Sequence, residues 1–152
     1  MGSEMCIRDS YRVTTPAGSV VIGGDAGNDI PKPPRDSSTS AQVEALAEGA
    51  DIVVHSTIHP IMGPEGGTKF PPPIYWRQSE AGDLGAMAKR AGVKQLMLTH
   101  LIPPLGTPRQ GPYKLPNGPL NESDYKSAVE KSGYEGVVIV GTDLTSVRLP
   151  SN

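Results

Sequence analysis

Short apolar runs alternate with stretches of helical periodicity along most of the chain. Each run is bounded by glycine, proline or polar residues and is too short for a helix, which indicates β-strands. The first two are separated by Pro16-Ala17-Gly18, which predicts a hairpin with a tight turn. The predicted strands are 11–15, 19–22, 51–54, 95–99 and 137–140, with an alternating edge strand at 144–149.

Three amphipathic helices lie between these strands. The first begins at Thr39-Ser40-Ala41-Gln42, an arrangement typical of a capping box, and the others are expected to begin at the caps Ser79 and Asn121. Each has one apolar stripe, so each can cover only one sheet face, and the pattern predicts an α/β fold. The stripes are Val43, Leu46, Ala47 and Ala50; Leu84, Met87, Ala88 and Ala91; and Tyr125, Ala128 and Val129, and the stop signals are Gly49, Gly92 and Gly133.

Four titratable residues follow predicted strands: Asp25, His55, His100 and Asp143. Ligands usually bind beyond the carboxyl ends of strands in open α/β sheets, so these side chains are expected along one rim. Imidazole and carboxylate are ligands of zinc, manganese and iron, which favours a metal or acid-base site. The alternatives are a turn aspartate bonded to its own backbone and hydrogen-bonded structural histidines.

Two proline- and glycine-rich loops, 56–75 and 102–119, exceed the usual length of a connection. They are interpreted either as walls or lids facing a substrate or as surface insertions. In or beside the first loop, His59, Tyr75 and Arg77 could line a pocket, and Trp76 is expected to pack.

Composition narrows the classes of partner. The chain has 152 residues, enough for one domain, a net charge of -2, and 5% aromatic residues, so we do not expect nucleic acid binding. The single Cys6 cannot form an internal disulfide, and no apolar run could span a membrane. A soluble protein is expected, with its compartment left open.

Residues 1–10 have no hydrophobic period and are interpreted as extraneous or disordered, with the domain at 11–150. The run Met5-Cys6-Ile7-Arg8-Asp9-Ser10 resembles a translated sequencing adapter, which would make the chain a fragment of a longer protein. The alternative is an ordinary frayed terminus.

Four segments carry a recognisable order of motifs: Gly23-Gly24-Asp25; the run from Gly49 to His55; the run from Ala88 to Leu101; and Val140-Gly141-Thr142-Asp143-Leu144. Together they resemble the C-terminal half of metallo-β-lactamase-fold hydrolases, in the ribonuclease Z and arylsulfatase-like branch. The resemblance runs from about Tyr11 to Pro150. It implies half of an αββα sandwich, with a mixed sheet and helices on one face.

The resemblance implies catalytic roles for Asp25, His55 and His100, and metal-ligand roles for two of them. Asp25 matches an aspartate that bridges two ions, zinc or else manganese or iron, and His100 matches the final histidine ligand. The activity implied is hydrolysis of a small-molecule ester, phosphoester, sulfate ester or lactone by water activated between the ions.

Three departures from the family limit what the chain can do alone. Ser56 stands where ribonuclease Z has glutamate, and Gln78-Ser79 stands where many relatives have His-Ser, which argues against tRNA processing. The family's His-x-His-x-Asp-His motif is absent. We therefore expect a fragment inactive by itself, which needs the missing N-terminal half or an oligomer partner.

A catalytically inactive structural or binding module is the alternative function. Metal bound by the complete protein and lost on Asp25→Ala would favour the hydrolase. A serine hydrolase is disfavoured because no Gly-x-Ser-x-Gly motif occurs, and no P-loop or His-Glu-x-x-His motif is present.

Overall fold

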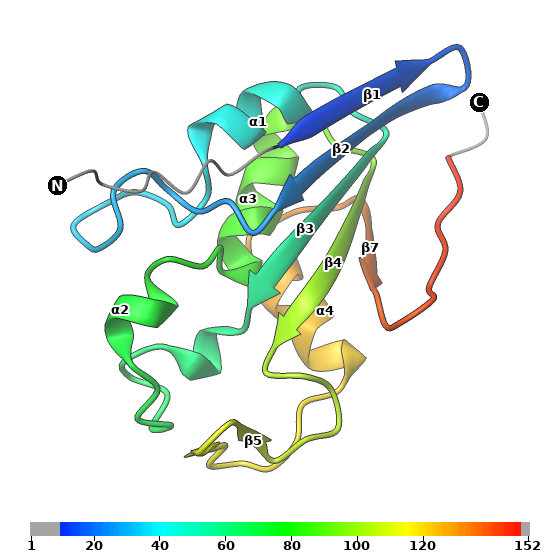
Figure 1. The fold of residues 1–152 in the computed structure, drawn as a ribbon. Helices are drawn as coiled ribbons and strands as arrows, with labels where there is room; N and C mark the ends of the chain where they lie inside the picture. The colour runs from blue at the N-terminus through cyan, green and yellow to red at the C-terminus, as the bar shows by residue number, and fades with distance from the viewer. Residues whose placement is uncertain (1–9, 150–152) are drawn as a thin grey trace, which may run out of the picture.

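The computed structural model describes residues 10–149, in which one five-stranded sheet forms the centre of the fold (Figure 1). The strand order is β1-β2-β3-β4-β7; β1 is antiparallel to β2, and the other neighbours are parallel. The predicted mixed α/β sheet is therefore confirmed. The prediction that residues 1–10 are extraneous or disordered concerns a segment that lies outside the described residues, apart from Ser10. The strands are β1 Tyr11–Thr15, β2 Gly18–Gly24, β3 Ile52–Ile58, β4 Gln95–Ile102 and β7 Val137–Val140.

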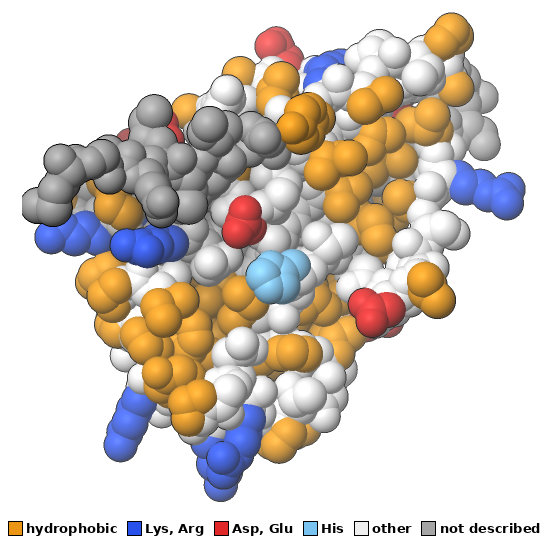
Figure 2. All heavy atoms as spheres, viewed as in Figure 1, with side chains coloured by type: hydrophobic (Ala, Val, Ile, Leu, Met, Phe, Trp, Pro, Cys, Tyr) orange, Lys and Arg blue, Asp and Glu red, His pale blue; other side chains and the backbone are white. Residues whose placement is uncertain are grey.

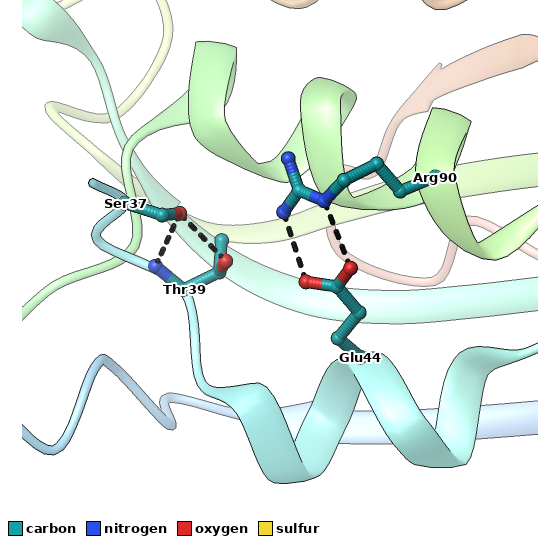
Figure 3. A network of polar contacts seen from close by, with 4 residues as sticks. All are labelled: Ser37, Thr39, Glu44 and Arg90. Atoms are coloured by element: carbon teal, nitrogen blue, oxygen red, sulfur yellow. Dashed lines mark hydrogen bonds and ion pairs between the residues drawn. The ribbon is translucent and has the colours of Figure 1, made fainter.

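Three helices cover one face of this sheet, as predicted: α1 (Ala41–Ala47), α3 (Ala81–Ala91) and α4 (Glu122–Glu130) (Figure 1). Their apolar stripes meet alternate residues of the strands in one core, which contains Val53 and Leu96. A bidentate ion pair joins α1 to α3, with Arg90 Nε and Nη2 each 2.8 Å from a carboxylate oxygen of Glu44 (Figure 3). None of the helices in residues 10–149 has the length and apolar character needed to cross a membrane.

Two predicted helix starts are wrong in detail. The N-cap of α1 is Ser40, whose Oγ accepts a hydrogen bond from Val43 N; valine at this third helical position cannot complete a capping box. The N-cap of α3 is Glu80, and the Ser79 side chain bonds elsewhere. The third start is confirmed, since Asn121 and Asp124 form a reciprocal capping box.

Two predicted strand ends and one predicted strand are also wrong. Both β3 and β4 continue beyond His55 and His100, because the two strands keep pairing as far as Ile58 and Ile102. Residues 144–149 form no strand. The Gln95 side chain donates to the Arg148 carbonyl at 3.5 Å, so this segment contacts the sheet through a side chain instead of a backbone ladder.

The two long loops pack against each other instead of extending into solvent. They contribute most of a second apolar cluster, in which Met62, Phe70, Tyr75 and Leu115 are buried and Trp76 packs at the margin, as expected for it. Small elements order the loops: η1 (Pro60–Met62), α2 (Pro72–Tyr75), β5 (Arg109–Gln110) and β6 (Tyr113–Lys114).

The face of the sheet opposite the helices has an apolar surface. Strand register aligns Tyr11, Ile22, Val54, Met97 and Ile139 across the five strands on this face. Tyr11 is 57% and Ile22 45% exposed. Figure 2 shows hydrophobic side chains gathered over the strands. In the part of the chain that the structure describes, helices cover one side of this sheet only, which is the arrangement expected of half a sandwich.

Candidate metal-binding edge of the sheet

Asp25 lies directly beyond β2, at the carboxyl edge of the parallel strands, and is exposed. The preceding Gly24 has φ +58°, a left-handed conformation that favours glycine. The turn is closed by a 3.2 Å hydrogen bond from Ala26 N to Gly23 O. The chain thus reverses immediately around the Asp25 carboxylate.

β-bulges interrupt the ladder next to both proposed ligands. Between β2 and β3, Ile22 pairs with Val54 and Gly24 pairs with His55, so Gly23 is the extra residue. On β4 the extra residue is His100, which has φ +41° and is exposed. Bulges redirect side chains, and positive φ in a non-glycine residue is often found at functional sites.

The spacing of the strands bears on whether Asp25 and His100 could share metal ions. Asp25 follows β2 and His100 lies within β4, and these two strands flank β3, so the two backbones are separated by two strand spacings, about 10 Å. A dinuclear centre, with ions about 3.5–4 Å apart and metal–ligand bonds of about 2 Å, has a span of similar order. Figure 2 shows an acidic side chain beside a histidine near the centre of the face of the molecule that it views.

A hollow of about 540 Å³ adjoins His100 at the carboxyl ends of β4 and β7. It brings His100 together with Asp143, as the strand pattern predicted, while Asp25 is not part of its lining. The sequence reasoning missed Thr142, Pro104 and Leu105 as site residues; their one signal was proximity in sequence to Asp143 and His100. The lining is His100, Leu101, Pro104, Leu105, Gly141, Thr142 and Asp143.

His55 lies beneath the Asp25 turn and is only 1% exposed. Its Nδ1 is 2.6 Å from the Ser56 carbonyl, so Nδ1 carries the proton that is donated; Nε2 is buried without a hydrogen-bond partner among the described residues. Burial holds the pKa of His55 below its usual value, against the opposing effects of the Ser56 and Ala26 backbones and the Asp25 charge. A neutral ring at this depth does not reach the hollow.

Close contact with His55 explains the glycine at position 23. A Cβ added to Gly23 would lie 2.2 Å from His55 Cδ2, closer than any real contact. The group that approaches this glycine so closely is a side chain of the same sheet.

The other residues singled out near the first loop do not join this edge. His59 stacks edge-on against Tyr125 at 5.2 Å between ring centroids, and its Nδ1 accepts a hydrogen bond from Ile61 N. Tyr75 is buried in the second apolar cluster and donates a hydrogen bond to Glu80, and Arg77 is exposed.

Residues 10–149 provide too few ligands to form a complete metal site by themselves. No group of three or more histidine, cysteine, aspartate or glutamate side chains is close enough to hold an ion there. A catalytic zinc usually takes three protein ligands and a water. Asp25 and His100 have the right donor chemistry, but they can form only part of such a centre.

Known proteins are similar to this chain in sequence and in fold. Ribonuclease Z from Mycobacterium tuberculosis strain H37Rv is 28% identical over 139 residues, covering 91% of this chain and 42% of that protein. Ribonuclease Z from Mycobacterium bovis BCG Pasteur 1173P2 has the same identity, with 41% of its length covered. No family model matches the sequence.

The solved structure of the metallo-β-lactamase-fold protein YhfI from Bacillus subtilis superposes with a TM-score of 0.54 at 17% identity. The superposition covers 87% of this chain and 40% of the YhfI chain. The chain carries part of a metallo-β-lactamase fold. Its sequence is ribonuclease Z-like, which confirms the resemblance, and it spans between 41% and 51% of the length of the ribonuclease Z relatives it matches.

Proposed function

We propose that this chain supplies two ligands, Asp25 and His100, to the metal centre of a metal-dependent hydrolase. The observation that carries this proposal is the pair of β-bulges at Gly23 and His100, both of which lie towards the carboxyl ends of the parallel strands. The metallo-β-lactamase fold and the similarity in sequence to ribonuclease Z support the hydrolase class.

Each proposed residue has its own task. The Asp25 carboxylate would hold two ions together, and the exposed His100 imidazole would bind one of them. Zinc is the ion proposed, with manganese or iron as alternatives of similar ligand preference. When bound, such ions lower the pKa of water and polarise the bond under attack. His55, for which the family resemblance also implies a catalytic role, would act through the Asp25 turn because its ring is buried.

We propose a small-molecule ester, phosphoester, sulfate ester or lactone as substrate. The hollow beside His100 has a volume within the usual range for small ligands, about 300–1,000 Å³. Its walls are Leu101, Pro104 and Leu105, with Thr142 and Asp143 as polar groups, and no lysine or arginine of residues 10–149 lines it. A site for a nucleic acid backbone would need cations against the phosphates.

The matched relatives are named as ribonucleases, so RNA is the competing substrate class. Hydrolysis of a neutral aryl ester and of a short RNA by the full-length protein would separate the two. Faster turnover of the aryl ester is expected, and RNA cleavage with no ester turnover would contradict the small-molecule proposal.

The metal centre would be completed by residues outside those described. The N-terminal half of the sandwich, or an oligomer partner, would supply them, because the described residues provide only two donors. The apolar sheet face around Tyr11 and Ile22 supports such a partner layer, since large exposed apolar patches usually mark contact surfaces.

Metal analysis of the full-length protein tests the proposal. We expect bound zinc or a similar ion, with most of it lost in Asp25→Ala and in His100→Ala. Asp29→Ala, which removes another exposed aspartate from the same loop, is the matched control and should retain the metal. Absence of metal from the unsubstituted protein would instead favour the inactive structural or binding module.

A further inference from the structure

Ser79 is buried, with 1% of its surface exposed, and its hydroxyl lies beneath the Asp25 turn. Ser79 Oγ donates to the Ala26 carbonyl at 2.9 Å and is 3.4 Å from the Ser38 carbonyl. Ala26 is the residue directly after Asp25. The hydroxyl therefore ties the downstream end of the turn to the body of the protein.

The backbone of Ser79 is itself anchored to the central strand. Its carbonyl accepts a 3.0 Å hydrogen bond from Ile58 N and a 3.4 Å hydrogen bond from Thr57 Oγ1, both at the end of β3. Since β3 is the middle strand of the sheet, Ser79 is a fixed point from which the turn can be held.

The upstream end of the same turn is held by packing. The His55 ring fills the space beside Gly23, so this backbone cannot move inward. Between the two ends, the Asp25 carboxylate has no hydrogen-bond partner among residues 10–149. Its position is therefore set by the backbone of residues 23–26 and not by contacts of its own.

We infer that Ser79 is a positioning residue for Asp25, acting through the Ala26 carbonyl. The inference rests on the proposed function for Asp25 as a metal ligand. It assigns to Ser79 the task of fixing the turn, so that the carboxylate is held in place before an ion arrives. Partners that orient metal ligands typically change metal affinity by about 10- to 100-fold when they are removed.

Ser79→Ala in the full-length protein tests the inference, with Ser132→Ala as matched control. Ser132 Oγ also donates to a backbone carbonyl, Val129 O at 2.6 Å, but lies just beyond α4, far in sequence from the turn. Ser79→Cys keeps a weak donor of similar size and covers the case in which Ser79→Ala fails to fold. The measurements are zinc affinity by titration, urea unfolding, and hydrogen exchange of the Ala26 amide.

We expect Ser79→Ala to weaken zinc binding by about 10-fold and to speed exchange of the Ala26 amide, with Ser79→Cys intermediate. Ser132→Ala should lower the stability to a similar degree and leave zinc affinity unchanged. Unchanged zinc affinity in Ser79→Ala, or unchanged Ala26 exchange, would overturn the inference.

The two measurements separate this inference from the proposed function. If the unsubstituted protein binds no zinc or similar ion, the proposed function fails. The Ala26 exchange rate still decides in that case whether Ser79 holds the turn, and equal rates in the unsubstituted protein and Ser79→Ala would show that it does not.

Discussion

Gly23 and His55 show how one pair of residues determines the shape of the sheet edge. The ring occupies the space that a side chain at position 23 would need, and its buried position leaves it no room to withdraw. Because Gly23 is also the bulge residue of β2, the same contact sets where the strand ends and where the turn that carries Asp25 begins.

Gly23→Ala should therefore reduce the free energy of unfolding by about 1–3 kcal/mol, the usual cost of overpacking a filled site. Urea denaturation measures this change. Adding Gly23→Ala to His55→Ala should cost less than adding it to the unsubstituted protein, because the clashing ring is gone. Gly82→Ala, within α3, is the control: its Cβ would lie 3.4 Å from its nearest neighbour, the Ala128 carbonyl oxygen of α4, and alanine favours a helix. Equal losses for the two glycines would contradict the packing argument.

Glu80 gives the stability a pH dependence at the residue scale. Burial raises the pKa of Glu80, against the opposing effect of the hydrogen bond donated by Tyr75. The folded protein therefore binds more protons than the unfolded chain between the unfolded pKa, about 4.3, and the higher folded pKa. The contribution of Glu80 to stability falls as pH rises through this interval.

Glu80→Gln removes the charge and keeps an oxygen that accepts the Tyr75 hydrogen. We expect the stability of this variant, relative to the unsubstituted protein, to increase as pH rises above about 4.3. Urea midpoints measured in parallel from pH 4 to pH 7 give the difference, in which the other titrating groups cancel. A difference that is constant with pH would contradict a raised pKa at this residue.

At the scale of elements, α1 and α4 begin by different means. The capping box of α4 joins Asn121 and Asp124 reciprocally, with the Asn121 amide N donating to Asp124 at 2.7 Å. The single cap bond of α1, from Val43 N to Ser40 Oγ, is long at 3.4 Å, and the end of this helix is held instead by Arg12, which donates to the carbonyls of Leu46 and Glu48. Local sequence thus stabilises α4 more than α1.

Asn121→Ala should lower the free energy of unfolding by about 0.5–2 kcal/mol, since the backbone amide of Asp124 would lose its side-chain acceptor at the start of α4. Ser40→Ala should cost less, because its cap bond is the weaker one. Chemical denaturation compares the two variants, and a larger loss for Ser40→Ala would contradict this ranking.

At the scale of the whole molecule, the sheet buries one face under helices and presents the other. Val13, Ile22 and Val137 are each about half exposed on the face opposite the helices. Apolar side chains in register across several strands form a continuous surface, which favours association with another layer.

We expect this chain, produced by itself, to self-associate. The double variant Val13→Thr with Ile22→Thr should reduce the association, because it removes apolar surface from exposed strand positions where threonine is tolerated. Light scattering after size-exclusion chromatography measures the mass, and Val53→Thr, on the helix side, should lower stability without reducing association. A monodisperse monomer of the unsubstituted chain would contradict the prediction.

The sequence by itself determined the elements whose signals are local. Hairpin residues around Pro16 and Gly18, the helical stripes, and the asparagine cap at 121 each act within a few positions of the chain, so their pattern can be read directly. The half-sandwich resemblance also followed from sequence, because the order of the strand-end motifs is fixed along the chain.

Only the tertiary structure decided what those strand ends do. The depth of His55, the bulge that exposes His100, and the hydrogen bond from Ser79 to the Asp25 turn depend on neighbours that come from separate strands and loops. Ser79, for example, had the local signature of a helix cap, yet its hydroxyl bonds a carbonyl 53 residues away. Such contacts arise from how strands align in space, which no short segment of the chain specifies.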